Sequence, residues 1–597
     1  MKTLKYSIMV LLAITINACN DDAFLTTVRT PEFGWKNLTE LEYAAVSPYK
    51  EMFYGGWGAT HGVLVTNQVM MSDYFRFLGN AEDYSTSQIY NRQMGIRVTE
   101  IETLYTKLYT VVGLANNGLT FIHNANDNPF QSTDSFQISE VKRIKGELYF
   151  MRAYAYYQLA TIFCPPYGYG NDEPILVKRD SVVYNAQSAL NNSPVPTSEI
   201  YELMISDLKQ AKALLPTDWK DGMDVSYKNR ARANKWAATA FLAQVYFTMK
   251  KFSGTESVLT ELDDLIGNGG FTLAVNPFEC FNNSSTTITS AYNATTNPGA
   301  QEVIFWAYYA DTRLSEKESP KIHEVIRYTH FNKCSRVSEN GGNGNKSNGN
   351  PVNWSNFHIW LQMVMSKNAL VEMGWMNADG TEPTAATYDK RYWNDLPNTP
   401  SNSSVNDNGL FYRYNGAFKS LAEYQTATGG SATSSRTDAS QDGKYIINSK
   451  HAGLIGQNEP VVLVNKYYRT KIGYIQNVPV IRLGEIYLNR AMARIKSGTP
   501  GWAADYNMVA RRAWNATLAG SAYVDKTDGE VNERMILKER WKELAGEDAW
   551  YLSFCEACGE TIGQGDRAES TSNLVAPYIG KSWKESIPLS EIDFQKK

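Results

Sequence analysis

Long helices with one apolar face are the feature of this sequence that most constrains its fold. Between residues 140 and 163, apolar side chains recur in steps of three and four, which places them on one face of a helix. Ser139 is a candidate N-cap, and the pair Pro165-Pro166 would end the helix. The predicted buried stripe consists of Val141, Ile144, Leu148, Met151, Ala155, Leu159 and Ile162.

Six further segments are predicted to be helical. Alanines at 233, 237, 240 and 243 would let a partner helix approach closely, and a Gly/Pro turn at 498–501 joins two helices. Paired helices with small residues at their contacts are typical of tetratricopeptide-like hairpins stacked into a solenoid, although the repeat consensus is degraded here. The predicted fold class is mainly α, with a frame of helical hairpins. The six segments are residues 99–122, 197–215, 230–250, 479–497, 502–517 and 530–544.

A long stretch between the helical segments has a different character. Residues 270–478 show little periodicity and contain a Gly/Asn-rich run at 338–353 and a Ser/Thr/Gly-rich run at 426–441. In such an arrangement the regular helices hold the loops in position, and the irregular loops bind the ligand. The expected parts are a signal peptide (1–18), a tether (19–40), an N-terminal helical region (41–269), an irregular insert (270–478) and a C-terminal helical region (479–597).

The N-terminus carries an export signal that ends on a cysteine. Lys2 and Lys5 precede an apolar run over residues 6–16, which is shorter than the roughly 20 residues that a membrane-spanning helix needs. The stretch ITINACNDD then places Ala18 before Cys19 and acidic residues after it. This pattern resembles the lipobox of bacterial lipoproteins, with Cys19 as the lipidated N-terminus, and the acidic stretch resembles a surface-export signal of the Bacteroidetes. The alternative is a plain secretory signal with a chance cysteine.

Composition argues against several functions. The chain has 58 Lys and Arg against 62 Asp and Glu, a net charge of −4, and removal of the two signal lysines leaves 56 against 62. Nucleic acid is not expected as a partner, because phosphate binding needs a basic face. Five cysteines remain besides Cys19, too few for a disulfide scaffold in a chain of 597 residues.

Motifs for catalysis and metal binding are incomplete. The segment HEVIR (323–327) has Arg327 where a zinc-protease helix needs its second histidine, so no metal site is predicted. Cys555 and Cys558 have CxxC spacing without a second pair, which leaves a local disulfide or two thiols as alternatives. The sequence contains no phosphate-binding loop, dinucleotide fingerprint or Gly-x-Ser-x-Gly elbow, and no cofactor is expected. The carboxylate pair of a glycoside hydrolase is defined by distance in space, so acidic residues alone do not predict one.

Many blocks of sequence, in order along the chain, resemble the SusD-like (RagB/SusD) lipoproteins of the Bacteroidetes. The resemblance covers essentially the whole mature chain, with departures clustered at residues 545–554. It implies a helical frame of four tetratricopeptide-like pairs with an irregular, ligand-binding insert. The blocks are GELYFMRAYAYYQLATIF, YELMISDLKQAKALLP, RANKWAATAFLAQVYFTM, PVIRLGEIYLNRAMARIKSG, YNMVARRAW, ILKERWKELAGEDAWYL and IPLSEI.

The resemblance also implies a function. Such a protein is a lipid-anchored lipoprotein on the outer face of the outer membrane, which captures a glycan without cutting it. It then delivers the glycan to a SusC-like TonB-dependent transporter. A second interpretation keeps the fold and the partner but captures oligopeptides. A third is a glycoside hydrolase, which the likeness to a binding family throughout the frame disfavours.

Aromatic residues supply the candidate ligand contacts. The chain has 14 Trp, 37 Tyr and 23 Phe, and an aromatic face can stack on the C–H face of a sugar ring. The resemblance implies that the ligand face consists of residues from the stretch before the first predicted helix (99–122) and from the insert. The alternative for each residue is ordinary packing, and FWAYYAD (305–311) could be a strand that turns only half its side chains outward. The candidate residues are Trp57, Asp73, Tyr74, Arg76, Phe77, Tyr84, Tyr90, Trp306, Tyr308, Tyr309 and Trp354.

Overall fold

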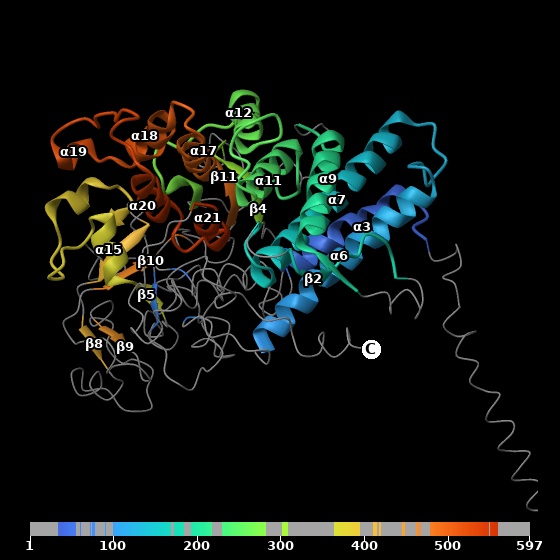
Figure 1. The fold of residues 1–597 in the computed structure, drawn as a ribbon, viewed down its shortest axis with the longest axis horizontal. Coiled ribbons are helices and arrows are strands. Elements are labelled where there is room, and N and C mark those ends of the chain that lie inside the picture. Colours follow the sequence, from blue (N-terminus) through green and yellow to red (C-terminus); the bar gives the residue numbers. More distant parts are fainter. Residues whose placement is uncertain are drawn as a thin grey trace, which may run out of the picture.

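The fold is known from a computed structural model, in which the described part of the chain is mainly helical (Figure 1). The predicted fold class is therefore confirmed. Short segments at 75–77, 410–414, 417–419, 445–447 and 461–464 are also described, as are the single residues 60, 72, 90 and 466. The main described ranges are 34–54, 99–168, 172–183, 193–217, 230–281, 301–307, 363–393, 478–547 and 550–558.

The helices of the frame form one continuous stack. In the N-terminal half they are α3 (Leu38–Tyr49), α6 (Thr99–Asn124), α7 (Ser135–Phe163), α9 (Thr197–Leu214), α11 (Lys235–Thr248) and α12 (Val258–Asn268). In the C-terminal half they are α17 (Leu483–Ser497), α18 (Trp502–Ala513), α19 (Ala516–Ala519), α20 (Glu533–Leu544) and α21 (Tyr551–Cys558). Successive helices pack in the order α6, α7, α9, α11, α12, α17 and α18, as the arc in Figure 1 shows. The contact between α12 and α17 joins the two halves although the insert separates them in sequence.

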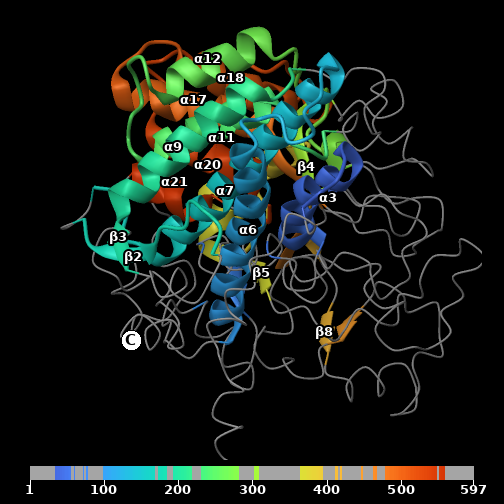
Figure 2. The ribbon, with the colours of Figure 1, turned by 90° about the vertical axis from the view of Figure 1, so that its right-hand side faces the viewer.

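Helix α7 runs through the centre of the N-terminal half. Of residues 140–163, all but Lys142 are buried, so the helix is covered on every side and not along a single stripe as predicted. Its neighbours α3, α6 and α9 explain this burial, and Figure 2 shows α6 alongside it. The helix also begins earlier than predicted, because the Asp134 side chain accepts a hydrogen bond from the Phe136 N–H. Ser139 lies inside the helix and donates to the Phe136 carbonyl instead of capping it.

Other helix boundaries follow from local capping and from strand pairing. The predicted helix at 197–215 is confirmed by α9, whereas α11 starts later than predicted, at Lys235, because the Asn234 side chain accepts from the Ala237 N–H. The predicted helix at 479–497 is wrong over its first residues. There the chain forms strand β11 (Val478–Arg482), which pairs with β4 (Val303–Ala307).

The strands are short and most of them belong to the insert. Antiparallel pairs join β1 (Phe75–Phe77) to β5 (Met363–Met365), β2 (Pro174–Val177) to β3 (Pro194–Pro196), and β7 (Phe411–Tyr414) to β10 (Val461–Val464). Parallel pairs join β6 (Tyr392–Trp393) to β7 and β8 (Ala417–Lys419) to β9 (Tyr445–Ile447). Four short helices complete the described elements: η2 (Lys50–Tyr54), η3 (Glu279–Phe281), α15 (Lys367–Met373) and η7 (Thr384–Tyr388).

An aromatic cluster binds the C-terminal end of the frame to its N-terminal half. The ring centroid of Trp550 lies 5.5, 5.4 and 5.6 Å from those of Tyr154, Tyr157 and Phe241. Each such ring contact contributes about 0.5–1.5 kcal/mol beyond the area that it buries. The two halves therefore share one core. Among the described helices, none has both the length and the apolar character needed to span a membrane.

Candidate functional site

Most residues nominated for the ligand face lie outside the described part of the chain. So do Cys19, the HEVIR segment and both low-complexity runs of the insert. Arg76, Phe77, Tyr90 and Trp306 are described. The nominated residues that fall outside it are Trp57, Asp73, Tyr74, Tyr84, Tyr308, Tyr309 and Trp354.

Strand β1, which covers Phe75–Phe77 at the end of the segment SDYFRF, pairs with β5 of the insert. Arg76 stands opposite Val364 of β5, and Phe77 stands opposite Met363. The neighbouring Phe75 is fully buried, whereas Arg76 is half-buried. Strand β5 also packs against β10. The structure thus unites two parts of the predicted ligand face, the stretch before α6 and the insert, through a backbone ladder that the sequence did not indicate.

Trp306 and Tyr90 belong to the core. Trp306 is 2 % exposed and Tyr90 is 6 % exposed, so neither ring presents a face to solvent. The strand that was the alternative for FWAYYAD exists as β4, but all five residues of β4 are buried, so it is covered on both faces. The run VIFWA carries this signal, because a continuous apolar run is typical of a strand buried on both sides.

The pair of strands β4 and β11 forms the base of the insert. The chain leaves the frame through β4 and returns through β11, and the two strands are hydrogen-bonded to each other in an antiparallel ladder. Strand β11 continues directly into α17. Ala307 and Val478, the described residues on either side of positions 308–477, are therefore paired with each other on the frame.

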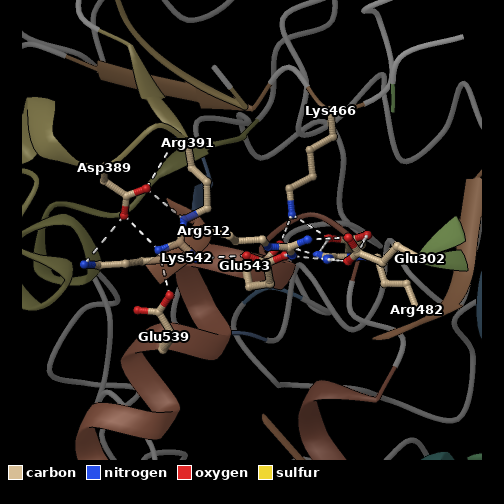
Figure 3. A network of polar contacts seen from close by, with 10 residues as sticks. Glu302, Asp389, Arg391, Lys466, Arg482, Arg512, Glu539, Lys542 and Glu543 are labelled. Atoms are coloured by element: carbon tan, nitrogen blue, oxygen red, sulfur yellow. Dashed lines mark hydrogen bonds and ion pairs between the residues drawn. The ribbon is translucent and has the colours of Figure 1, made fainter. Parts of the chain in front are cut away.

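A buried network of charged groups fastens this base to α18 and α20 (Figure 3). Arg482, the last residue of β11, donates to Glu302 at 3.1 Å and to Glu547 at 2.6 Å. Arg512 of α18 bonds to Glu302 and to Glu543 of α20. Five carboxylates and five cations belong to the network: Glu302, Asp389, Glu539, Glu543 and Glu547, with Arg391, Lys466, Arg482, Arg512 and Lys542.

Two further cations of the network come from the insert itself. Lys466, just after β10, donates to Glu547 at 2.7 Å and to the Glu543 carbonyl at 2.7 Å. Burial lowers the pKa of Lys466 to about 8, although the Glu547 carboxylate opposes that shift. Arg391, beside β6, donates to Glu543 at 2.9 Å and pairs with Glu539 at 2.8 Å. Separate points of the insert are thus fixed to one helix, α20.

Two carboxylates at the centre of this network, Glu302 and Glu543, are unsuited to acid catalysis. Burial alone would raise the pKa of Glu302, but the guanidinium groups of Arg512 and Arg482 outweigh it and lower that pKa. The same guanidinium groups, with Arg391, lower the pKa of Glu543. A glycoside hydrolase needs one carboxyl group that stays protonated, with a raised pKa. Glu302 and Glu543 are instead each paired with Arg482 and Arg512, which links β11 to α18 and α20.

The structure also bears on the CxxC motif and on metal binding. Cys555 and Cys558 are buried thiols on α21, so of the two alternatives for the CxxC motif the structure has the thiols. Within the described ranges, no cluster of three or more His, Cys, Asp or Glu side chains could hold a metal ion.

Comparisons with known proteins place the chain among SusD-like proteins. A family model described as starch-binding and associating with the outer membrane matches residues 58–247, and the SusD family model matches residues 325–552. A SusD-like protein of Formosa agariphila is 28% identical over 258 residues, which are 42% of this chain and 44% of that protein. The matched region thus spans less than half the length of that relative.

Three solved structures are similar over nearly the whole chain. A SusD superfamily protein from Bacteroides vulgatus has a TM-score of 0.61 at 16% identity, and a SusD-like carbohydrate-binding protein from Bacteroides fragilis has 0.58 at 17%. A laminarin-binding SusD-like protein has 0.55 at 17%. Each comparison covers 94% of this chain and 98% of the other chain. Identities this low show a shared fold, which is helical and tetratricopeptide-like.

Proposed function

This chain belongs to the SusD family, and from that membership we propose that it captures a glycan and delivers it to a SusC-like TonB-dependent transporter. Two matched family models, one in each half of the chain, are the observation that carries the proposal. Family description and structural neighbours both point to carbohydrate as the ligand class. The chain binds and does not cut, in keeping with the ion-paired carboxylates of its buried network.

The proposed ligand face lies on the loops that the frame carries. Its aromatic contacts are Trp57, Tyr74, Tyr84, Phe77, Tyr308, Tyr309 and Trp354, and Asp73 and Arg76 supply polar contacts. Pairing of β1 with β5 supports this grouping, because it joins the SDYFRF segment to the insert. Trp306 and Tyr90 are left out, since their burial leaves no ring face for a sugar to stack on.

Binding at such a face is expected to be weak. Each stacked ring contributes about 0.5–1.5 kcal/mol beyond area burial, and each hydrogen bond adds about 1 kcal/mol because water competes for the same hydroxyl groups. Two or three rings with a few hydrogen bonds, less the cost of association, lead to about −4 to −8 kcal/mol, or millimolar to micromolar dissociation constants. Weak binding suits a carrier that must release its ligand.

The partner and the anchor complete the proposal. Residues 1–18 are removed, Cys19 is lipidated, and residues 19–40 tether the helical regions (41–269 and 479–597) and the ligand-binding insert (270–478) to the outer face of the outer membrane. A protein that stays on a transporter through repeated delivery needs a large interface, on the order of 2,000 Å² or more.

Calorimetry of the purified protein with a panel of oligosaccharides, laminarin fragments included, tests the proposed ligand class. We expect millimolar to micromolar binding that Trp57→Ala or Trp354→Ala weakens. Tyr43→Ala is the matched control, because Tyr43 is an exposed aromatic residue of α3 that was not nominated for the ligand face. Binding to a peptide panel alone would replace glycan by oligopeptide, and shortening of the oligosaccharides during incubation would overturn the binding-only function.

A further inference from the structure

A pocket lies between the C-terminal helices and the part of the insert that follows β5. It has a volume of about 200 Å³ and is bounded by α15, η7, α18 and α20. None of the residues nominated for the ligand face lines it. Its two walls are joined by backbone hydrogen bonds, from the Lys390 N–H to the Ala513 carbonyl and from the Asn515 N–H to the Tyr388 carbonyl, both at 2.7 Å. We call it the α18–α20 pocket.

Three half-buried aromatic rings line one side of this pocket. Ring centroids of Tyr388 and Trp514 lie 5.6 Å apart, and those of Trp514 and Tyr523 lie 6.0 Å apart, both in edge-to-face geometry. Hydrogen bonds fix two of the rings, since the Trp514 indole N–H donates to the Ser521 carbonyl at 2.9 Å and the Tyr523 hydroxyl donates to Asn507 at 3.0 Å. The rings are therefore pre-organised, which reduces the entropy lost on binding.

A buried indole N–H and a lysine supply donor groups to the same pocket. The indole N–H of Trp375 is buried and has no hydrogen-bond partner within the described residues. Lys542 pairs with Asp389 at 3.8 Å, and its Nζ atom lies 5.9 Å from the ring centroid of Trp375. Buried polar groups are normally hydrogen-bonded, so the Trp375 N–H indicates a missing partner.

Acceptor groups stand beside these donors. The carboxylates of Asp389 and Glu539 line the pocket and are held by Arg391, at 2.8 Å in each case. Burial would raise the pKa of Asp389, but the Arg391 guanidinium outweighs it and keeps that pKa below its ordinary value. Asp389 is therefore an ionised acceptor at neutral pH. Three cations, Arg391, Lys526 and Lys542, line the pocket beside these two carboxylates, so both signs of charge face a ligand there. This charged rim would not suit a purely apolar ligand.

We propose that the α18–α20 pocket binds one neutral sugar residue, as a second carbohydrate site separate from the ligand face. Aromatic faces, hydroxyl acceptors and amine donors around a volume for a single ring match the two surfaces of a pyranose, one apolar and one polar. The carbohydrate class rests on the proposed function, whereas the location rests on the pocket itself. Two weak sites on one carrier raise its avidity for a long or branched glycan.

Saturation-transfer NMR with the methyl glycosides of glucose, galactose, mannose and xylose tests the pocket on the full chain. At least one should bind the wild type, and Trp514→Ala should weaken that binding about tenfold, through loss of a stacked ring and its buried area. Ala510→Leu fills the pocket without removing a ring and should have the same effect, which covers the case in which Trp514→Ala fails to fold. Tyr43→Ala, with an exposed ring on α3, should bind like the wild type.

Oligosaccharide binding to the same variants separates this proposal from the proposed function. If oligosaccharides bind Ala510→Leu and the wild type equally, and no methyl glycoside distinguishes the two proteins, the pocket proposal is overturned and the ligand face stands. If Ala510→Leu abolishes all binding and Trp57→Ala changes nothing, the pocket stands and the assigned ligand face is wrong. Absence of any glycan binding to the wild type would overturn both.

Discussion

Replacement of Glu543 tests the buried charge network most directly. Glu543 is fully buried on α20 and accepts hydrogen bonds from Arg391, at 2.9 Å, and from the guanidinium groups of Arg482 and Arg512. Glu543→Gln keeps the size of the side chain but removes its charge, so five cations then face four carboxylates. Removing one partner of a buried ion pair costs about 3–5 kcal/mol, because the other charge stays buried and uncompensated. We expect the free energy of unfolding to fall by about that amount.

Urea unfolding followed by circular dichroism measures this loss at pH 7. In calorimetry, an unfolding entropy of about 2.1 cal/mol/K per residue over 597 residues converts the loss into a decrease in Tm of about 2–4 °C. Glu256→Gln is the matched control. Glu256 pairs with Lys209 at 2.5 Å on the surface, where solvent and salt screen the interaction, so little change is expected.

The pH dependence of stability gives a second readout for Glu543. Burial alone would raise its pKa, but Arg512, Arg482 and Arg391 outweigh burial and hold the pKa well below the ordinary value of 4.5. The carboxylate therefore stabilises the fold fully above that pH, and its contribution is lost as the pH falls toward the lower folded value. The difference between wild type and Glu543→Gln should shrink below about pH 4.5. Equal stabilities of Glu543→Gln and Glu256→Gln at pH 7 would refute the reasoning.

The anchor and the buried lysine can be tested separately. Cys19→Ala should abolish labelling of the protein at the surface of whole cells, and unchanged surface display would contradict lipidation at this residue. The folded pKa of Lys466, about 8, lies below its unfolded value of 10.5, so the unfolded state binds the proton more tightly between these values. Wild-type stability should therefore rise relative to Lys466→Met as the pH increases from about 8 to about 10.5. Urea unfolding at both ends of that window measures the change, and a difference in stability that stays constant would contradict the lowered pKa.

The helices were predictable where periodicity and a terminator occur together. Helix α9 matches its prediction, and α17 ends at Ser497 before Gly498, which adopts the left-handed conformation that favours glycine. Errors arose where the deciding partner was non-local or where two caps competed. Strand β11 pairs with β4, far away in sequence, and Asp134 and Ser139 are both good N-cap residues, so the sequence does not show which one caps α7.

The charge network and the α18–α20 pocket were beyond sequence reasoning for a related reason. Glu302, Arg391, Lys466, Arg512 and Glu543 belong to five separate segments, and each resembles one of the many surface charges of a soluble protein. These charged side chains come together, away from water, only when the chain folds. The same holds for the pocket, whose three half-buried aromatic residues come from η7, from the end of α18 and from the loop before α20.

Gly484 is a position at which the charge network restricts the choice of residue. It lies in the first turn of α17, where glycine costs roughly 1 kcal/mol relative to alanine, yet a Cβ atom there would come within 2.9 Å of both Arg482 and Arg512 and 3.1 Å of Glu302. Since ion pairs hold these groups in place, Gly484→Ala should destabilise the protein in urea unfolding despite its better helix propensity. Exposed Gly113 of α6 is the control, because its Cβ would meet no atom within 4 Å, and Gly113→Ala should add about 0.5–1 kcal/mol of stability. Equal stabilisation by both alanines would mean that the guanidinium groups move aside freely and do not clamp the base of the insert.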